Sequence, residues 1–165
     1  MWLNCFIIYL SSNLVFSGEK GFYSINDELN PKTNYGKFKL LIEQLLVNEA
    51  LSKFAVLRMT KVVSEKSNES FPWQIDIKEG GIVEMYTNVM LAPVSMNEVA
   101  DAILAILRST QSGFFQISAD QEISYYRYAK NWALKNDFNP NLIIPTICMD
   151  PIVSKHNSLL TYLPC

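Results

Sequence analysis

Apolar and polar positions predict a strand, a helix and a second strand within the first 60 residues. The run FIIYL, residues 6 to 10, is rich in β-branched and aromatic residues, and polar SSN follows it, as at the end of a buried parallel strand. Next, apolar residues recur at helical spacing and predict one buried stripe: Phe38, Leu41, Ile42, Leu45 and Leu46. The run FAVLRM, residues 54 to 59, has the length of another buried strand. This order is a βαβ unit, so we predict an α/β fold with a parallel sheet.

Capping signals predict the elements of the second part of the chain. Ser95 and Glu98 have the spacing of a capping box, and the following helix should bury Val99, Ile103, Ile106 and Leu107. Gly113 opens GFFQIS, which reads as a strand, and Ser124 is placed to cap a helix through YYRYAKNWALK. The tail from Pro140 holds four prolines and is expected to be irregular.

Two polar stretches interrupt these elements. Residues 17 to 34 are rich in Gly, Ser, Asn, Asp and Pro without an apolar period, so they predict a long functional or mobile loop. The stretch SEKSNESFPW, which begins at residue 64, is the best place for a boundary between domains.

The N-terminal run MWLNCFIIYL has an alternative interpretation as a signal-peptide core. It lacks a basic start, and ten residues are too few to span a bilayer, which takes about 20. We therefore prefer the strand and expect no membrane association.

Composition narrows the classes of partner and the compartment. The chain has 49% apolar residues, 14 basic and 16 acidic residues and a net charge of -2, which suits a packed core and argues against nucleic acid as a partner. Cys5, Cys148 and Cys165 form no C-x-x-C pair, and the single histidine, His156, has no cysteine near it. We expect neither a disulfide framework nor a metal site, and a cytoplasmic location.

A tyrosine and a lysine at the start of the predicted helix are candidates for catalysis. Tyr35 and Lys39 stand four positions apart and so lie on one helix face. A free phenol has a pKa of about 10, and an ammonium held beside a phenol lowers that pKa toward the working range. Carbonyl reduction needs such a proton donor, and the hydroxyl of Ser12, at the end of the first strand, can hold the same oxygen. Alone, the Y-x-x-x-K spacing is weak evidence, because ordinary helices contain it by chance.

Together with their neighbours, these residues resemble the extended short-chain dehydrogenase/reductase superfamily, which includes sugar-nucleotide reductases, epimerases and dehydratases. The nearest branch resembles dTDP-4-dehydrorhamnose reductase and its substrate-binding domain. The similar segments are Ser12 leading into NLVFSG, PKTNYGKFK, the strand ending in Leu57 and Arg58, APVSMNEVADAI and GFFQIS. The resemblance runs over roughly residues 6 to 135, and the combination is more specific than any single part.

The resemblance implies a partial, Rossmann-like parallel sheet with a small α+β substrate-binding region. Residues 1–60 would be the remnant of an NAD(P)-binding domain carrying catalytic Ser12, Tyr35 and Lys39, and residues 61–165 the substrate-binding region, partly weaving back to the sheet. Lys39 would also bind the nicotinamide ribose. The implied ligands are NAD or NADP and a nucleotide-linked sugar.

Two segments depart from the family pattern. The family holds the cofactor pyrophosphate on a glycine-rich turn, and no G-x-x-G-x-x-G follows a strand in this sequence. By comparison with the family, about a hundred preceding residues are expected to be absent. Val63 and Ser64 stand where the family has an aromatic residue and a glycine. We therefore expect a chain that binds no cofactor alone and is inactive by itself. The alternatives are a non-catalytic binding or assembly subunit with the same fold and a half-enzyme completed by another chain. We also expect self-association, because the missing strands leave an exposed sheet edge.

Several other residues have open interpretations. Arg58 and Thr60 are candidates to bind substrate, Arg58 through phosphate, although a structural ion pair at the strand end is the more typical role of such an arginine. Tyr125, Tyr126, Tyr128 and Trp132 have helical spacing and could stack on a base, but such residues more often pack a core. Asp27 and Glu28 read as solvated loop carboxylates.

Overall fold

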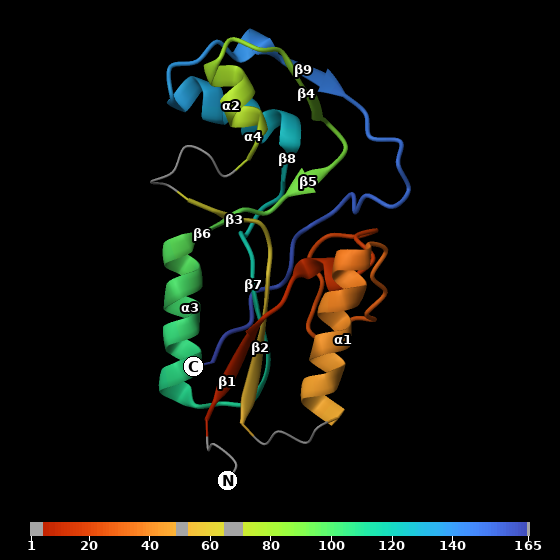
Figure 1. The fold of residues 1–165 in the computed structure, drawn as a ribbon, viewed down its shortest axis with the longest axis vertical. Helices are drawn as coiled ribbons and strands as arrows, with labels where there is room; N and C mark the ends of the chain where they lie inside the picture. Colours follow the sequence, from red (N-terminus) through yellow and green to blue (C-terminus); the bar gives the residue numbers. More distant parts are fainter. Residues whose placement is uncertain (1–4, 49–52, 65–70, 165) are drawn as a thin grey trace.

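A three-stranded parallel sheet forms the centre of the molecule. The computed structural model describes residues 5–48, 53–64 and 71–164. The strands β1 (Ile7–Leu10), β2 (Phe54–Met59) and β7 (Gly113–Ile117) lie in the order β1-β2-β7. Helix α1 (Asn34–Asn48) covers one face of this sheet and α3 (Met96–Ser109) the other (Figure 1). The predicted α/β fold with a parallel sheet is thus confirmed, and residues 113–117 return to the sheet from the second half of the chain.

A smaller α+β lobe lies beyond the carboxyl ends of these strands (Figure 1). It holds the helices α2 (Trp73–Lys78) and α4 (Tyr125–Lys135), the parallel pair β4 (Val83–Tyr86) and β9 (Ile143–Thr146), and the antiparallel pair β5 (Met90–Leu91) and β8 (Ile123–Ser124). The parallel pair β3 (Val62–Val63) and β6 (Val94–Ser95) lies where the two parts join. Short 3-10 turns η1 (Asn13–Val15) and η2 (Pro140–Leu142) complete the elements.

The helix starts that were predicted from local signals are confirmed. Ser95 Oγ accepts from Glu98 N at 3.1 Å, and Glu98 Oε2 accepts from Ser95 N at 2.6 Å, which is the predicted capping box. Ser124 Oγ accepts from Arg127 N at 3.2 Å and caps α4. The hydrogen bonds between Glu98 and Ser95 lower the pKa of Glu98 below its ordinary value.

The buried faces of two helices differ from the predicted ones. In α3, Ala102 is buried with Val99 and Ile106, whereas Leu107 is 46% exposed. In α1, Phe38, Leu41 and Leu45 are exposed, and the buried residues are Gly36 and Glu43. The helix meets the sheet through a close approach at Gly36 and an ion pair at Glu43, so the predicted stripe lies to one side of the contact.

The tail from Pro140 was predicted to be irregular, and this is wrong in part. Residues 143–146 form β9 along β4, and later residues form isolated bridges between Tyr23 and Leu159 and between Gln116 and Tyr162. The proline in β9 removes one backbone donor, which an edge strand tolerates. Local signals do not reveal such pairing, because the partner strand lies about 60 residues away in the sequence.

The tail is also held by a partly buried carboxylate, that of Glu122. Glu122 accepts from His156 Nδ1 at 2.7 Å and from the backbone N–H groups of Asn157 and Ser158 at 2.9 and 3.0 Å. Burial raises the pKa of Glu122, but these hydrogen bonds outweigh burial and hold the pKa below its ordinary value.

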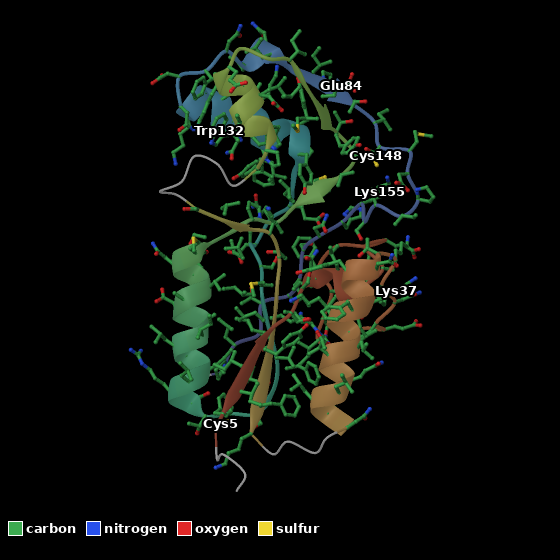
Figure 2. All side chains as sticks on the ribbon, in the orientation of Figure 1. Cys5, Lys37, Glu84, Trp132, Cys148 and Lys155 are labelled. Carbon is green, nitrogen blue, oxygen red and sulfur yellow. The ribbon has the colours of Figure 1, made fainter. Side chains whose placement is uncertain are left out.

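The aromatic residues of α4 belong to the core of the smaller lobe. Tyr125, Tyr126, Tyr128 and Trp132 pack against a cluster that includes Phe71 and Trp73. Trp132 lies edge-on to Trp73 at 5.3 Å between ring centroids, inside the upper lobe (Figure 2). Tyr126, Tyr128 and Trp132 therefore serve mainly in packing, whereas Tyr125 also lines the cavity described below. Among the described residues, no helix is long and apolar enough to span a bilayer.

Candidate active site

A cavity of about 640 Å³ lies at the carboxyl ends of β1 and β2, where the smaller lobe meets the sheet. Ligands of open α/β sheets bind at this edge, outside the carboxyl ends of the strands. The lining comes from four parts of the chain: residues 10–14 after β1, the start of α1, residues 59–62 after β2, and the smaller lobe with its tail. Four of the residues that the sequence singled out line this cavity together: Ser12, Tyr35, Lys39 and Thr60.

Ser12 is fixed by the turn that follows β1. Its side chain is 7% exposed, and its Oγ accepts from Leu14 N at 3.2 Å as the cap of η1. The hydroxyl therefore occupies one position at the strand end, on the wall of the cavity. A fixed hydroxyl can orient a ligand oxygen without paying to become ordered.

Tyr35 and Lys39 line the same cavity from the first turns of α1. Tyr35 is 54% exposed, and Lys39 Nζ lies 5.5 Å from the centre of its ring. Lys39 Nζ also donates to Leu10 O at 2.9 Å and lies 5.0 Å from the centre of the Tyr9 ring. Burial raises the pKa of Tyr9, although the Lys39 ammonium acts in the opposite direction. The ammonium is thus held between the strand end and the two phenols.

Gly36 permits α1 to approach the turn that carries Ser12. A Cβ atom at Gly36 would lie 2.1 Å from Leu14 O, which no side chain can tolerate without displacement of the backbone. Gly36 N donates to Thr33 Oγ1 at 3.0 Å and so fixes the start of the helix. The glycine after the tyrosine therefore brings Tyr35 to the same cavity as Ser12.

Arg58 lies beneath the cavity and does not line it. Its guanidinium is bound by Glu43, with Nη2 2.8 Å from Oε2 and Nε 3.2 Å from Oε1, and both side chains are 2% exposed. Ser11 Oγ donates to the same carboxylate at 2.5 Å. The pair joins α1 to β1 and β2 directly below Ser12, which favours the ion-pair interpretation of Arg58. Thr60, also buried, donates its hydroxyl to Ala92 O.

Sequence reasoning missed Glu43 and the tail. Glu43 follows Lys39 by four positions, and this helical spacing is the signal that would have placed it on the same face. No comparable signal exists for Asn157, whose Oδ1 accepts from Asn13 Nδ2 at 2.8 Å across 144 positions. Asp27 accepts a hydrogen bond from Ser24 N and pairs with Lys20 at 2.9 Å, and both contacts keep it in the loop. Hydrogen bonding to Lys20 lowers the pKa of Asp27.

A parallel sheet with a serine, a tyrosine and a lysine around one cavity at the carboxyl ends of its strands defines the class of extended short-chain dehydrogenases/reductases. The chain belongs to the RmlD substrate binding domain family, whose model matches residues 2–156.

Individual proteins agree with this assignment. The probable low-salt glycan biosynthesis reductase Agl14 of Haloferax volcanii is 28% identical over 124 residues, which are 71% of this chain and 41% of that protein. A dTDP-4-dehydrorhamnose reductase from Bacillus anthracis, solved with NADP, has the same fold with a TM-score of 0.83, 18% identity and coverage of 95% of this chain and 57% of its own. MoeE5, solved with UDP-glucuronic acid and NAD, gives a TM-score of 0.75 and 20% identity, covering 92% of this chain and 54% of its own. The chain thus spans about half the length of these relatives.

Proposed function

We propose that this chain carries the substrate-binding part and the catalytic side chains of a reductase that acts on a nucleotide-linked 4-keto sugar. The observation that carries the proposal is the common cavity of Ser12, Tyr35 and Lys39. The reductase named in the family relatives and the nucleotide sugar bound by MoeE5 support the same class of substrate.

The roles of the three side chains follow from their positions. Tyr35 donates its phenolic proton to the carbonyl oxygen, while the Ser12 hydroxyl holds that oxygen in place. Lys39 supplies a fixed positive charge that stabilises the phenolate left behind, and its remaining ammonium protons are free to bind a ribose hydroxyl. Arg58 is buried with Glu43 and orients α1 beneath these groups. In our proposal Arg58 is therefore a positioning residue and does not bind the phosphate of the substrate. The product is the alcohol.

The cofactor of this reaction is NAD or NADP, which supplies the hydride when bound. The cavity offers the residues that suit the reactive end of such a cofactor, with Lys39 at its edge. The 165 residues contain no glycine-rich turn for the pyrophosphate. We therefore propose that activity requires a segment or chain that supplies this turn, and that the reaction takes place in the cytoplasm, where the free thiols of Cys5 and Cys148 stay reduced.

The decisive experiment restores that turn, by fusion or by mixing with a chain that contains it, and measures turnover of a nucleotide-linked 4-keto sugar. Changing Tyr35 to Phe removes only the hydroxyl, so turnover should fall by about 10²–10⁴-fold while substrate binding changes little. Calorimetry on the 165-residue chain alone should detect no binding of NADH or NADPH.

Tyr86→Phe is the matched control, because Tyr86 is 40% exposed on β4 and does not line the cavity. It should leave turnover unchanged. A Tyr35→Phe protein that is as active as the unmodified one would refute the catalytic role of Tyr35 and favour the alternative of a non-catalytic subunit. Micromolar binding of NADH by the chain alone would refute the requirement for a separate cofactor turn.

A further inference from the structure

The candidate active site has a charge opposite to that of the whole chain. The net charge of the protein is -2, yet the only charged residues that line the cavity, within the part of the chain that the structure describes, are Lys39 and Lys61. No lining residue is a carboxylate. Two positive charges in a concave site favour an anionic ligand, since the walls limit screening by water.

The backbone of Lys61 is held on both sides. Thr60 N donates to Ile117 O at 3.3 Å, and Val94 N donates to Lys61 O at 3.0 Å. The next residue, Val62, pairs with Val94 in the parallel pair of β3 and β6. The lysine therefore projects from a fixed point just past the carboxyl end of β2, on a different wall from α1.

The ammonium of Lys61 is available to a ligand. Its Nζ lies 4.5 Å from the centre of the Phe71 ring, and within the described residues it has no carboxylate partner. In contrast, Lys39 donates to Leu10 O, and Lys20 and Lys32 pair with Asp27 and Glu19 at 2.9 and 3.0 Å. The aromatic ring positions the charge without neutralising it.

We propose that Lys61 forms an anion subsite that binds an oxyanion of the ligand while Tyr35 and Ser12 face its carbonyl group. The inference rests on the proposed function and deepens it, because it assigns a specificity-determining residue outside the serine, tyrosine and lysine set. The oxyanion is either the diphosphate of the nucleotide or a carboxylate on the sugar ring. Both meet an ammonium through the same charge-assisted hydrogen bond.

Two commercial ligands that differ in one group separate these sources: UDP-glucose, which has only the diphosphate, and UDP-glucuronic acid, which also has a carboxylate. Binding of each to the 165-residue chain is measured by NMR titration, at low and high salt. The variants are Lys61→Gln, Lys61→Arg and the control Lys37→Gln, whose side chain lies on α1 outside the cavity and points away from the sheet (Figure 2).

Lys61→Gln should weaken binding roughly five- to tenfold and reduce its salt dependence, with Lys39 accounting for the part that remains, whereas Lys61→Arg and Lys37→Gln should bind as the unmodified chain does. Equal losses for both ligands identify the diphosphate as the oxyanion. A loss confined to UDP-glucuronic acid identifies the carboxylate. A structural role of Lys61 would instead change the melting temperature without affecting salt dependence.

If Lys61→Gln bound both ligands with the affinity and salt dependence of the unmodified chain, the anion subsite would be refuted and the proposed function would stand. If the unmodified chain bound neither ligand, the sugar-nucleotide function would fail, and the role of Lys61 would fail with it.

Discussion

At the scale of single residues, the buried pair of Glu43 and Arg58 combines stability with the geometry of the site. Arg58 Nη2 lies 2.8 Å from Glu43 Oε2, and the guanidinium lies 5.2 and 4.9 Å from the ring centres of Phe16 and Phe114. Removing one member of such a pair leaves the other charged and unpaired in the core, which costs far more than the pair itself gains.

We expect Glu43→Gln to lower the free energy of unfolding by about 3–5 kcal/mol, as measured by urea denaturation. The solvent-accessible pair of Lys20 and Asp27 provides the control, since Asp27→Asn should cost much less than Glu43→Gln. The double change Glu43→Leu with Arg58→Met should recover much of the loss, because it removes both charges. Equal effects of Glu43→Gln and Asp27→Asn would contradict a structural role for the buried pair.

The same residues mark a limit of sequence reasoning. The positions of Ser12, Tyr35 and Lys39 at one cavity followed from their spacing and from the resemblance, because these residues follow a strand or begin a helix. The sequence left Arg58 with two interpretations, and only the contact with Glu43 separates them. The sequence alone did not single out Lys61. Its charge becomes a candidate for binding only once the structure shows that it lines a cavity without carboxylates.

At the scale of elements, the packing of α1 on η1 depends on the absence of a side chain at Gly36. Alanine is the better helix former by about 1 kcal/mol, so propensity alone predicts that Gly36→Ala stabilises the protein. The 2.1 Å approach of the added Cβ to Leu14 O predicts the reverse, because backbone must move.

We expect Gly36→Ala to destabilise the protein by about 1–3 kcal/mol in denaturant unfolding, with slower chemistry in the restored enzyme. Lys37→Ala, next along the same helix and exposed, should have little effect on either quantity. A Gly36→Ala protein of higher stability would mean that α1 and η1 do not lie as closely as described.

Elements that are set by local signals were predictable and elements that are set by distant pairing were not. The cap at Ser95, the helix after Ser124 and the three sheet strands were read from a few neighbouring residues. The two-residue strands β3, β5, β6 and β8 carry no period of their own, and β9 exists only through β4. Helix α2 follows a polar stretch and has only six residues, so it is likewise too short to show a periodic pattern.

At the scale of the whole molecule, the sheet has an open edge. Within the described residues, β1 pairs only with β2, and Ile7 and Leu10 on this strand are 36% and 40% exposed. An edge strand with unpaired backbone groups pairs readily with another chain.

We expect the 165-residue chain to self-associate through β1, which sedimentation velocity over a range of concentrations will detect. Ile7→Lys places a charge on this edge and should shift the distribution toward monomer, since inserted lysines are a common protection of edge strands. A chain that stays monomeric at all concentrations would refute association through this edge.

The bond between Asn13 and Asn157 has a consequence for the order of events during synthesis. The residues that line the cavity run from 10 to 157 in the sequence, so the ribosome synthesises those of the first wall long before those of the tail. Strand β1 can pair with β2 once residue 59 has emerged, but the wall that carries Asn13 lacks its partner from the tail until residue 157 has emerged. Long waits of this kind expose nascent chains to aggregation and to capture by chaperones. Translation speed should therefore govern the yield of correctly assembled protein more than it does for a fold that closes locally.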